Sequence, residues 1–305
     1  MDRPMHTYSI VARDPETGEM GVAVQSHWFS VGALCPWAQA GVGALATQSF
    51  VNVSFGPRGL ALLAEGKTAP QVVQALIEAD EGREVRQLAV VDAQGNVAAH
   101  TGSGCIAAAG HTVGAGYSAQ ANMMLNGEVW PAMAMAYEAS QGPLAERLVA
   151  ALEGAQQAGG DIRGKQSAAL IVVRAQPTGQ SWEDRLVNLR VEDHETPVVE
   201  IKRLLRVHRA YEHMNHGDLA LEAGDVEGAL AAYRTAQEMF PDNLEMRYWH
   251  AISLANLGRV DEALPMLAGI FAQDANWRTL TGRLPSVGLL DVSEIDLTRI
   301  VGAGN

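Results

Sequence analysis

Two apolar stretches near the N-terminus end in polar residues that could take part in nucleophilic or acid–base chemistry. The first ends in Ser26 and His27, and the second ends in Thr47 and Gln48. A serine and a histidine act as nucleophile and base only where their side chains converge, and neighbouring residues of a strand point to opposite faces. We therefore predict that Ser26 lies in a site with His27 at its rim, and that one of Thr47 and Gln48 faces the same site. His27 and Gln48 are candidate substrate-binding residues.

Further polar residues gather in a glycine loop and after a stretch rich in glycine and alanine. In the loop, Arg163 could hold a substrate carboxylate by a bidentate contact, and Asp161 could orient it or bind an α-amino group. Gln166 follows in the same loop and is a third candidate for substrate binding. The simpler interpretation is an ion pair that braces a glycine turn. Asn122 or Gln120 could supply an amide donor to an oxyanion, and Gln120 is also a candidate for substrate binding; alternatively, both are ordinary amides at a strand end.

The cysteines and histidines do not predict thiol or metal chemistry. Cys35 and Cys105 are too few for a disulfide framework and fit a reducing compartment. No electropositive surroundings that would favour a thiolate are visible near Cys35, so we expect both to be small buried hydrophobic residues. We expect neither a metal nor an organic cofactor, because the histidines lack the HExxH spacing and have no accompanying cysteines or carboxylates. The histidines considered are His208, His213, His216 and His250.

The elements that position these residues follow an α+β order. The N-terminal hairpin turns at 14–18, which carries Asp, Pro and Gly, and a second hairpin is predicted at 87–100. Each is followed by two predicted helices, with the small residues of 105–127 suiting a pocket wall. An apolar strand at 168–173 should be central and buried on both faces, and 186–191 is a last strand. This order predicts a layered α+β domain with two sheets stacked between helices.

The last third of the chain follows the spacing of tetratricopeptide repeats. The sequence AGDVEGALAAY is mirrored by LGRVDEALPML one repeat length later. Two repeats alone bury little surface, so we expect them to pack on the first domain or on another copy, which predicts a homo-oligomer, and to recruit a protein partner. We divide the chain into a first domain (1–195), a linker helix with two repeats forming an all-α domain (196–280) and a C-terminal cap or tail (281–305).

Charge and hydropathy narrow the function classes. The net charge of −13 argues against a nucleic-acid partner, which would favour a basic surface. No apolar run reaches the ~18 residues of a membrane span, and the N-terminus, MDRPMHTYSI, lacks the apolar segment of a signal peptide. We expect a cytoplasmic protein that acts on a small-molecule substrate, with neither nucleic acid nor membrane as partner.

Four segments resemble a known family. They are TYSIVARDPETGEMGVAVQSHWFSVGALCPWAQAGVGALATQ, QLAVVDAQGNVAAHTG, YSAQANMM and GGDIRGKQSAALIVV, all within residues 1–195. They are similar to the bacterial and archaeal DUF1028 proteins. The resemblance implies a fold like that of the N-terminal-nucleophile (Ntn) hydrolases, a four-layer αββα sandwich. It also implies amide-bond hydrolysis without a cofactor, and Arg163 with Asp161 suggests a small carboxylated substrate.

By position, the resemblance makes Thr7 the nucleophile of an amidohydrolase. In Ntn hydrolases the first residue of the first strand attacks an amide while its own free α-amine, which titrates near ~8, acts as the base. This chain departs from that pattern because six residues, Met1 to His6, precede Thr7, and no lysine lies between Thr7 and Gln48. The nucleophile is then either Thr7 after a cut behind His6, or Ser26. The alternative is an inactive Ntn-like binding or scaffold protein whose repeats recruit a partner.

Overall fold

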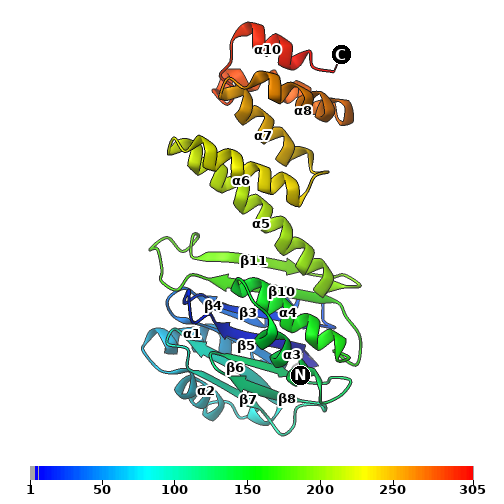
Figure 1. Cartoon of the computed structure of the whole chain (residues 1–305). Coiled ribbons are helices and arrows are strands. Elements are labelled where there is room, and N and C mark those ends of the chain that lie inside the picture. Colours follow the sequence, from blue (N-terminus) through cyan, green and yellow to red (C-terminus); the bar gives the residue numbers. More distant parts are fainter. Residues whose placement is uncertain (1–3, 6, 305) are drawn as a thin grey trace. The chain divides into compact units, whose positions relative to one another are not determined.

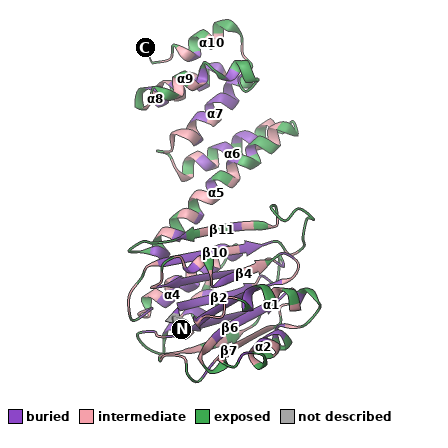
Figure 2. Ribbon diagram, turned by 180° about the vertical axis from the view of Figure 1, so that it is seen from behind, coloured by how far each residue is buried: buried purple, intermediate pink, exposed green. Residues whose placement is uncertain are grey.

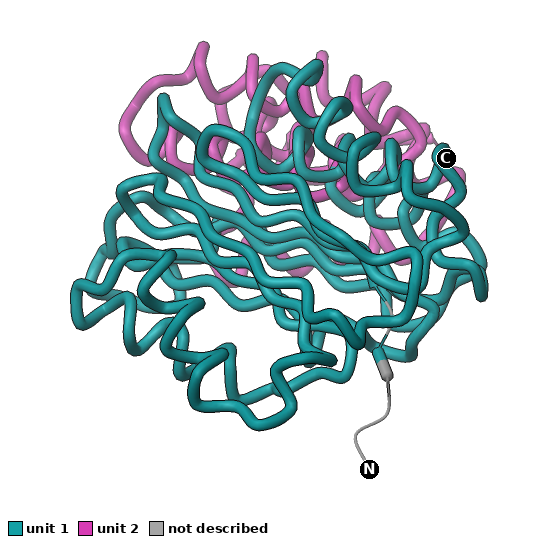
Figure 3. The backbone as a smooth tube through the Cα atoms, turned by 90° about the horizontal axis from the view of Figure 1, so that it is seen from below, with its two compact units in different colours: residues 1–205 teal, residues 206–305 magenta. Residues whose placement is uncertain are grey.

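The computed structural model describes residues 4–5 and 7–304 and divides the chain into two compact units, 1–205 and 206–305 (Figure 3). The first unit is mixed α/β with antiparallel sheets, and the second is helical (Figure 1). The boundary falls inside helix α5 (Pro197–Glu222), which is one continuous element. In the part of the chain that the structure describes, no helix is both long and apolar enough to cross a membrane.

The larger sheet of the first unit is built around the N-terminal hairpin, β2 and β3. The hairpin turns where the sequence predicts, because the Asp14 carboxylate accepts the backbone N–H groups of Glu16 and Thr17 at 2.8 and 3.2 Å. The apolar strand β10 pairs with β3 on one side and β11 on the other, which confirms its predicted central position. The antiparallel order is β11 (Arg185–Val191), β10 (Ser167–Val173), β3 (Met20–Ser26), β2 (Thr7–Arg13), β9 (Tyr117–Ala121) and β8 (Gly110–Gly114).

The smaller sheet is built around β5 (Gly43–Phe50). One edge of β5 pairs with β6 (Arg86–Asp92), which continues to β7 (Val97–Thr101). Two short strands share its other edge: β4 (Pro36–Gln39) beside its first half and β1 (Pro4–Met5) beside its end. The chain therefore starts in the smaller sheet with β1 and enters the larger sheet with β2.

Each sheet carries a pair of helices. Helices α1 (Phe55–Ala64) and α2 (Ala69–Glu78) pack on the smaller sheet, where Leu45 and Leu88 enter their apolar cluster. Helices α3 (Val129–Ala139) and α4 (Leu144–Gln157) pack on the larger sheet. Successive side chains of a strand alternate between faces, so Ile10 packs toward α3 and α4 whereas Val11 joins the cluster shared by both sheets. Figure 2 shows buried residues running along the strands of both sheets.

Four strands lie where the sequence pattern predicts none. β8 and β9 occupy the stretch expected to be a pocket wall, β4 lies in the expected loop after β3, and β1 precedes the predicted hairpin. β8 and β9 are rich in small residues and lack the β-branched alternation that marks a strand. They form because partner strands and aromatic side chains cover them: a Cβ added at Gly110 would lie 2.5 Å from the ring of Trp130.

The second unit consists of antiparallel helical hairpins. Gly224 and Gly258, the corresponding glycines of the two predicted repeats, both end a helix with positive φ, +78° and +75°. Ala229 and Ala263, also at matching positions, are fully buried at helix contacts. Both repeats therefore have the same local structure. The helices that follow α5 are α6 (Val226–Met239), α7 (Leu244–Asn256), α8 (Val260–Gln273), α9 (Asn276–Thr281) and α10 (Glu294–Val301).

Candidate active site

Thr7 and Ser26 face each other at one end of the β2–β3 hairpin. They are register partners, with Thr7 Oγ1 3.2 Å from Ser26 Oγ, and both residues are fully buried. Alternate residues of a strand share a face, so they point in the same direction as Val11 and Val24, which belong to the apolar cluster between the sheets. The two candidate nucleophiles thus lie together in the interior between the sheets.

The main chain before Thr7 closes over its hydroxyl group. Met5 is fully buried and pairs with Ser49 of β5, and the Thr7 hydroxyl donates to the Met5 carbonyl oxygen over 3.1 Å. In the full chain the nitrogen of Thr7 belongs to a peptide bond and cannot act as a base. The predicted cut behind His6 falls on a residue outside the described part of the chain, as residues 1–3 also do.

Gln48 connects the two sheets through its side-chain amide. Its Oε1 accepts the Ser9 hydroxyl at 2.6 Å, and its Nε2 donates to Gln87 Oε1 at 2.7 Å and to the carbonyl oxygen of Thr7 at 3.2 Å. Gln48 and Gln87 belong to the smaller sheet, and Ser9 and Thr7 to the larger one. Of the pair Thr47 and Gln48, Gln48 therefore faces Thr7. A buried network of this kind holds its members rigidly, because each unmade bond would be costly in a low-dielectric interior.

Gln120 and Asn122 belong to the same network. Gln120 Nε2 donates to Ser9 Oγ at 2.7 Å, and Asn122 Nδ2 donates to Gln87 Oε1 at 2.9 Å and to the carbonyl oxygen of Thr7 at 3.4 Å. Both amides thus have ordinary hydrogen-bond partners, as the simpler interpretation of the sequence allowed. Asn122 reaches the main chain of Thr7, whereas Gln120 lies opposite Ser9. We call the five residues Ser9, Gln48, Gln87, Gln120 and Asn122 the amide network.

The amide network reaches the surface at Thr101. Gln87 Nε2 donates to Thr101 Oγ1 at 2.9 Å, and Thr101 Oγ1 lies 2.8 Å from His111 Nδ1. Burial, and secondarily the nearby His100, lower the pKa of His111, which favours its neutral form. Thr101 and His111 line a cavity of about 510 Å³ together with Cys105. A continuous chain of hydrogen bonds therefore runs from this cavity to the main chain of Thr7.

Asp161, Arg163 and His27 form a second group beside the ends of β2 and β3. The fully buried carboxylate of Asp161 accepts Arg163 Nη2 at 2.7 Å and Nε at 3.1 Å, and also the backbone N–H of His27 at 3.2 Å. This pairing braces the glycine turn, as the simpler interpretation predicts. The backbone N–H of Gln166 donates to the carbonyl oxygen of Ser26 at 3.2 Å. The loop thus borders Ser26, and His27 lies outside the pair of hydroxyl groups.

Gln25 occupies the opposite face of β3 from Ser26. It is fully buried, and neither atom of its side-chain amide has a hydrogen-bond partner within the described residues. It pairs in register with Tyr8, whose hydroxyl donates to Gln156 Oε1 at 3.2 Å. Burial, with a smaller contribution from the charge of Asp161, raises the pKa of Tyr8, so this phenol stays protonated.

Neither cysteine has the properties of a nucleophile. Cys35 is fully buried, with Sγ 3.7 Å from Gln48 Oε1, and burial raises its pKa far above the ordinary value. Burial also raises the pKa of Cys105, against weaker hydrogen bonds that lower it. Both thiols therefore stay protonated at neutral pH. Cys35 is buried as predicted, whereas Cys105 is only half-buried, which corrects the prediction for that residue. Among the described residues, no group of three or more histidine, cysteine or acidic side chains could hold a metal ion.

Sequence reasoning did not single out Ser9 and Gln87, which are central members of the amide network. Each is fully buried. Gln87 is the second residue of β6, and the residues that follow it, Leu88 to Val91, are all apolar, while Ser9 lies between Tyr8 and Ile10. Such residues can be recognised in the sequence as isolated polar residues within an apolar strand, because a buried polar group must find a hydrogen-bond partner.

Comparison with known proteins supports both resemblances. The chain is similar to the crystal structure of a protein from Silicibacter pomeroyi described with the DUF1028 family, at 32% identity and a TM-score of 0.59, over 66% of this chain and 88% of that one. None of the curated proteins compared matches the chain. A tetratricopeptide repeat model matches 220–284, and the model described as a family of unknown function (DUF1028) matches 7–201, beginning at Thr7. The chain belongs to the DUF1028 family and carries a tetratricopeptide-like region behind it.

Proposed function

We propose that the first unit is an amide-bond hydrolase with the αββα layer order of the Ntn hydrolases. The layer order is supported by a helix pair on each sheet and by the apolar cluster that both sheets share. The observation that carries the proposal is the pair of Thr7 and Ser26, whose hydroxyl oxygens lie 3.2 Å apart between the sheets. Thr7 is also the residue at which the family match begins.

Catalysis would begin with a cut behind His6, which frees the α-amine of Thr7. The amine, with a pKa near ~8, takes the proton from Thr7 Oγ1 as that oxygen attacks the substrate carbonyl carbon. Asn122 Nδ2, which lies 3.4 Å from the Thr7 carbonyl oxygen, would donate to the oxyanion. The leaving amine takes the proton back as the C–N bond breaks, which leaves an ester on Thr7. Water then hydrolyses the ester and releases the acid.

Removal of residues 1–6 would also open the site. Met5 fills buried space beside Thr7, and its carbonyl oxygen accepts the Thr7 hydroxyl. Without this segment the hydroxyl faces an empty space bordered by the glycine loop, since Gln166 bonds to Ser26 there. The side chain of Arg163 is 28% exposed at this loop and would receive the carboxylate of a small substrate.

A comparison of two chain forms tests this function. One is the full chain, and the other begins at Thr7 behind an initiator Met that is removed during expression, with both N-termini verified by mass spectrometry. We expect the shortened form to release acetate from a panel of N-acetyl amino acids and Thr7→Val in that form to lose the activity. Activity that persists in a full chain with an intact N-terminus, and is lost in Ser26→Ala, would replace Thr7 by Ser26 as nucleophile. No release by either form would favour the binding function below.

A binding function is the second candidate, because a specific observation favours it. The tetratricopeptide-like region is compatible with a protein partner, and the second unit holds a cavity of about 770 Å³ lined by Trp249, Tyr211 and three carboxylates. The carboxylates are those of Asp218, Glu222 and Glu245, and none of the described residues that line this cavity is a lysine, arginine or histidine. We propose that the repeats recruit a partner through a basic segment. The expected homo-oligomer stays a prediction, which light scattering of the full chain over a range of concentrations tests.

A further inference from the structure

A cavity of about 580 Å³ in the first unit shares no lining residue with the amide network or with the Asp161 group. It lies where β10 and β11 of the larger sheet meet the short strand β4 and helix α1 of the smaller sheet. Its volume falls within the range of small-molecule sites, about 300–1,000 Å³. The cavity is therefore a separate candidate site, large enough for a compact organic ligand.

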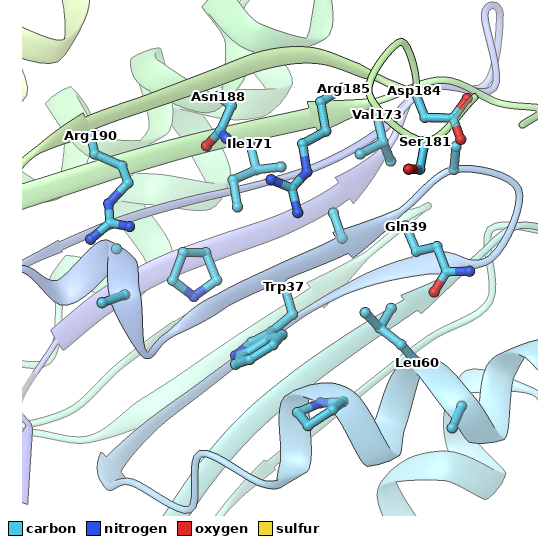
Figure 4. Close-up of a pocket in the computed structure, with 17 residues that line it drawn as sticks. Trp37, Gln39, Leu60, Ile171, Val173, Ser181, Asp184, Arg185, Asn188 and Arg190 are labelled. Atoms are coloured by element: carbon cyan, nitrogen blue, oxygen red, sulfur yellow. The ribbon is translucent and has the colours of Figure 1, made fainter. Parts of the chain in front are cut away.

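Two arginines of β11 extend into this cavity. Figure 4 shows the side chains of Arg185 and Arg190 reaching from the strand toward the interior of the cavity. Arg190 is already paired, with Nε 2.8 Å from the carboxylate of Glu192. Arg185 has no ion pair with any carboxylate of the described chain. A guanidinium group without a partner retains its full set of N–H donors in a planar fork, which matches a carboxylate.

The acidic group nearest to Arg185 in the sequence does not neutralise it. Asp184 also lines the cavity, but its Oδ1 accepts the backbone N–H and the hydroxyl of Thr178 at 2.8 and 2.9 Å. Of the charged groups that line the cavity, Arg190 is paired with Glu192, and Asp184 is bonded to Thr178 rather than to an arginine. Arg185 is therefore the guanidinium group that can receive an anionic ligand.

The opposite wall of the cavity is apolar and fixed. Trp37 of β4 donates its indole N–H to the carbonyl oxygen of Leu34 at 2.9 Å, which holds the ring in one orientation. One side of the ring is pressed against α1, because a Cβ added at Gly56 would lie 2.2 Å from it. Leu60 of α1 extends this apolar wall, and Ile171 of β10 lies on the side of the arginines (Figure 4). A held aromatic ring and two aliphatic side chains suit a flat, apolar ligand body.

We propose that this cavity binds a small aromatic carboxylate, with its acid group on Arg185 and its ring against Trp37. The ligand needs both an acid group and a ring. An acid group alone would gain little from an exposed arginine, and a ring alone would not interact with the charge of Arg185. This site does not depend on Thr7, so it stands whether or not the first unit is a hydrolase.

Calorimetric titration of the full chain with matched probes tests this site. The probes are naphthalene-2-carboxylate and its neutral counterpart, naphthalene-2-carboxamide. We expect the carboxylate to bind with a Kd below ~1 mM and the amide to bind about tenfold more weakly. Arg185→Gln should weaken carboxylate binding about tenfold and leave amide binding unchanged, whereas Trp37→Leu should weaken both.

Control variants distinguish specific binding in the cavity from an effect of the protein's overall charge. Arg203→Gln makes the same charge change on an exposed arginine outside the cavity, one that pairs with Glu200 at 2.6 Å, and should leave both affinities unchanged. Arg185→Lys keeps the charge but loses the fork, and should give an intermediate affinity. Melting curves of every variant confirm that it folds. Equal affinities for the two probes, or an equal loss in Arg185→Gln and Arg203→Gln, would overturn the proposal, as would absence of carboxylate binding.

Discussion

The side-chain oxygens of Thr7 and Ser26 lie 3.2 Å apart on paired strands, and both residues are fully buried. The amide of Gln48 reaches the main chain of Thr7 from the other sheet. The hydroxyl pair is therefore held from two sides, by the pairing of its own strands and by the smaller sheet. The stability of the interior between the sheets and the geometry of the candidate site depend on the same hydrogen bonds.

The first prediction concerns the central amide of that network. Gln48→Leu removes the acceptor of Ser9 and the donor to Gln87, which leaves buried polar groups without partners. Each such group costs about 1–3 kcal/mol, so we expect the free energy of unfolding to fall by about 3 kcal/mol in urea titration. Gln74→Leu is the matched control, because Gln74 is exposed and bonds only to Glu78 at 2.8 Å. It should change stability by no more than about 0.5 kcal/mol.

The second prediction is that replacing a different buried glutamine, Gln25, stabilises the protein. Gln25 is fully buried with neither amide atom bonded within the described residues. Gln25→Met keeps the length of the side chain and removes the unpaired polar atoms, so we expect stability to rise by about 1 kcal/mol. The urea midpoint measures the change. A loss of stability comparable to that of Gln48→Leu would show that a bound water or ligand satisfies Gln25.

The third prediction concerns acid stability. Burial raises the pKa of Asp80, but hydrogen bonds from Asn52, Arg86 and the backbone of Gly82 lower it more, and the net shift is downward. A carboxyl group whose pKa is lower in the folded state stabilises the fold above its unfolded pKa of about 3.9. That contribution is lost as the pH falls through the folded value.

We therefore expect Asp80→Asn to be less stable than the wild type at pH 6 and to lose less stability on acidification. Urea midpoints at intervals from about pH 6 to pH 3 measure both effects, since the loss begins near pH 5 for such groups. Arg86 bonds to Asp80 Oδ2 at 3.0 Å, so high salt should reduce the difference only partly. Parallel curves for the two proteins would contradict the assignment.

The fourth prediction uses the glycines of the repeats. Gly224 and Gly258 have positive φ, and an added Cβ would meet nothing within 4 Å. Any loss in Gly224→Ala or Gly258→Ala therefore comes from the backbone, at about 1 kcal/mol each. Gly269 is the control, since it lies inside α8 without positive φ and its added Cβ would approach only the flexible end of Arg247, at 3.3 Å. Gly269→Ala should raise the melting temperature, and the other two should lower it.

Sequence reasoning identified the elements whose patterns are local. The hairpin of β2 and β3, the central strand β10 and the repeats all follow from alternation, turn residues and period. The strands β1, β4, β8 and β9 could not be predicted in this way, because they lack a β-branched alternation and are defined by the strands with which they pair. The amide network was predicted in part. Gln48, Gln120 and Asn122 lie near strand ends and were candidates, whereas Ser9 and Gln87 become hydrogen-bond partners only when the two sheets stack.

The glycine loop shows the same limit. Asp161 and Arg163 are close in sequence, so their ion pair was foreseeable, whereas the bond from His27 to Asp161 joins residues 134 positions apart. The alternation of Ser26 and His27 was predicted from strand geometry alone, since it needs no knowledge of partners. Long-range polar contacts require the register of whole sheets, which a single sequence does not contain.

Ser9, Gln48, Gln87, Gln120 and Asn122 share one property with a wider consequence: each both donates and accepts hydrogen bonds, and none carries a charge. The direction of the chain is fixed at its ends, because Gln48 Nε2 donates to the carbonyl oxygen of Thr7 and Gln87 Nε2 donates to those of Gly110 and Ala121, and a backbone carbonyl oxygen only accepts. Rotating either amide by half a turn would place two oxygens against each other. The network therefore keeps one polarity around Thr7, which does not depend on the charge of any of its members.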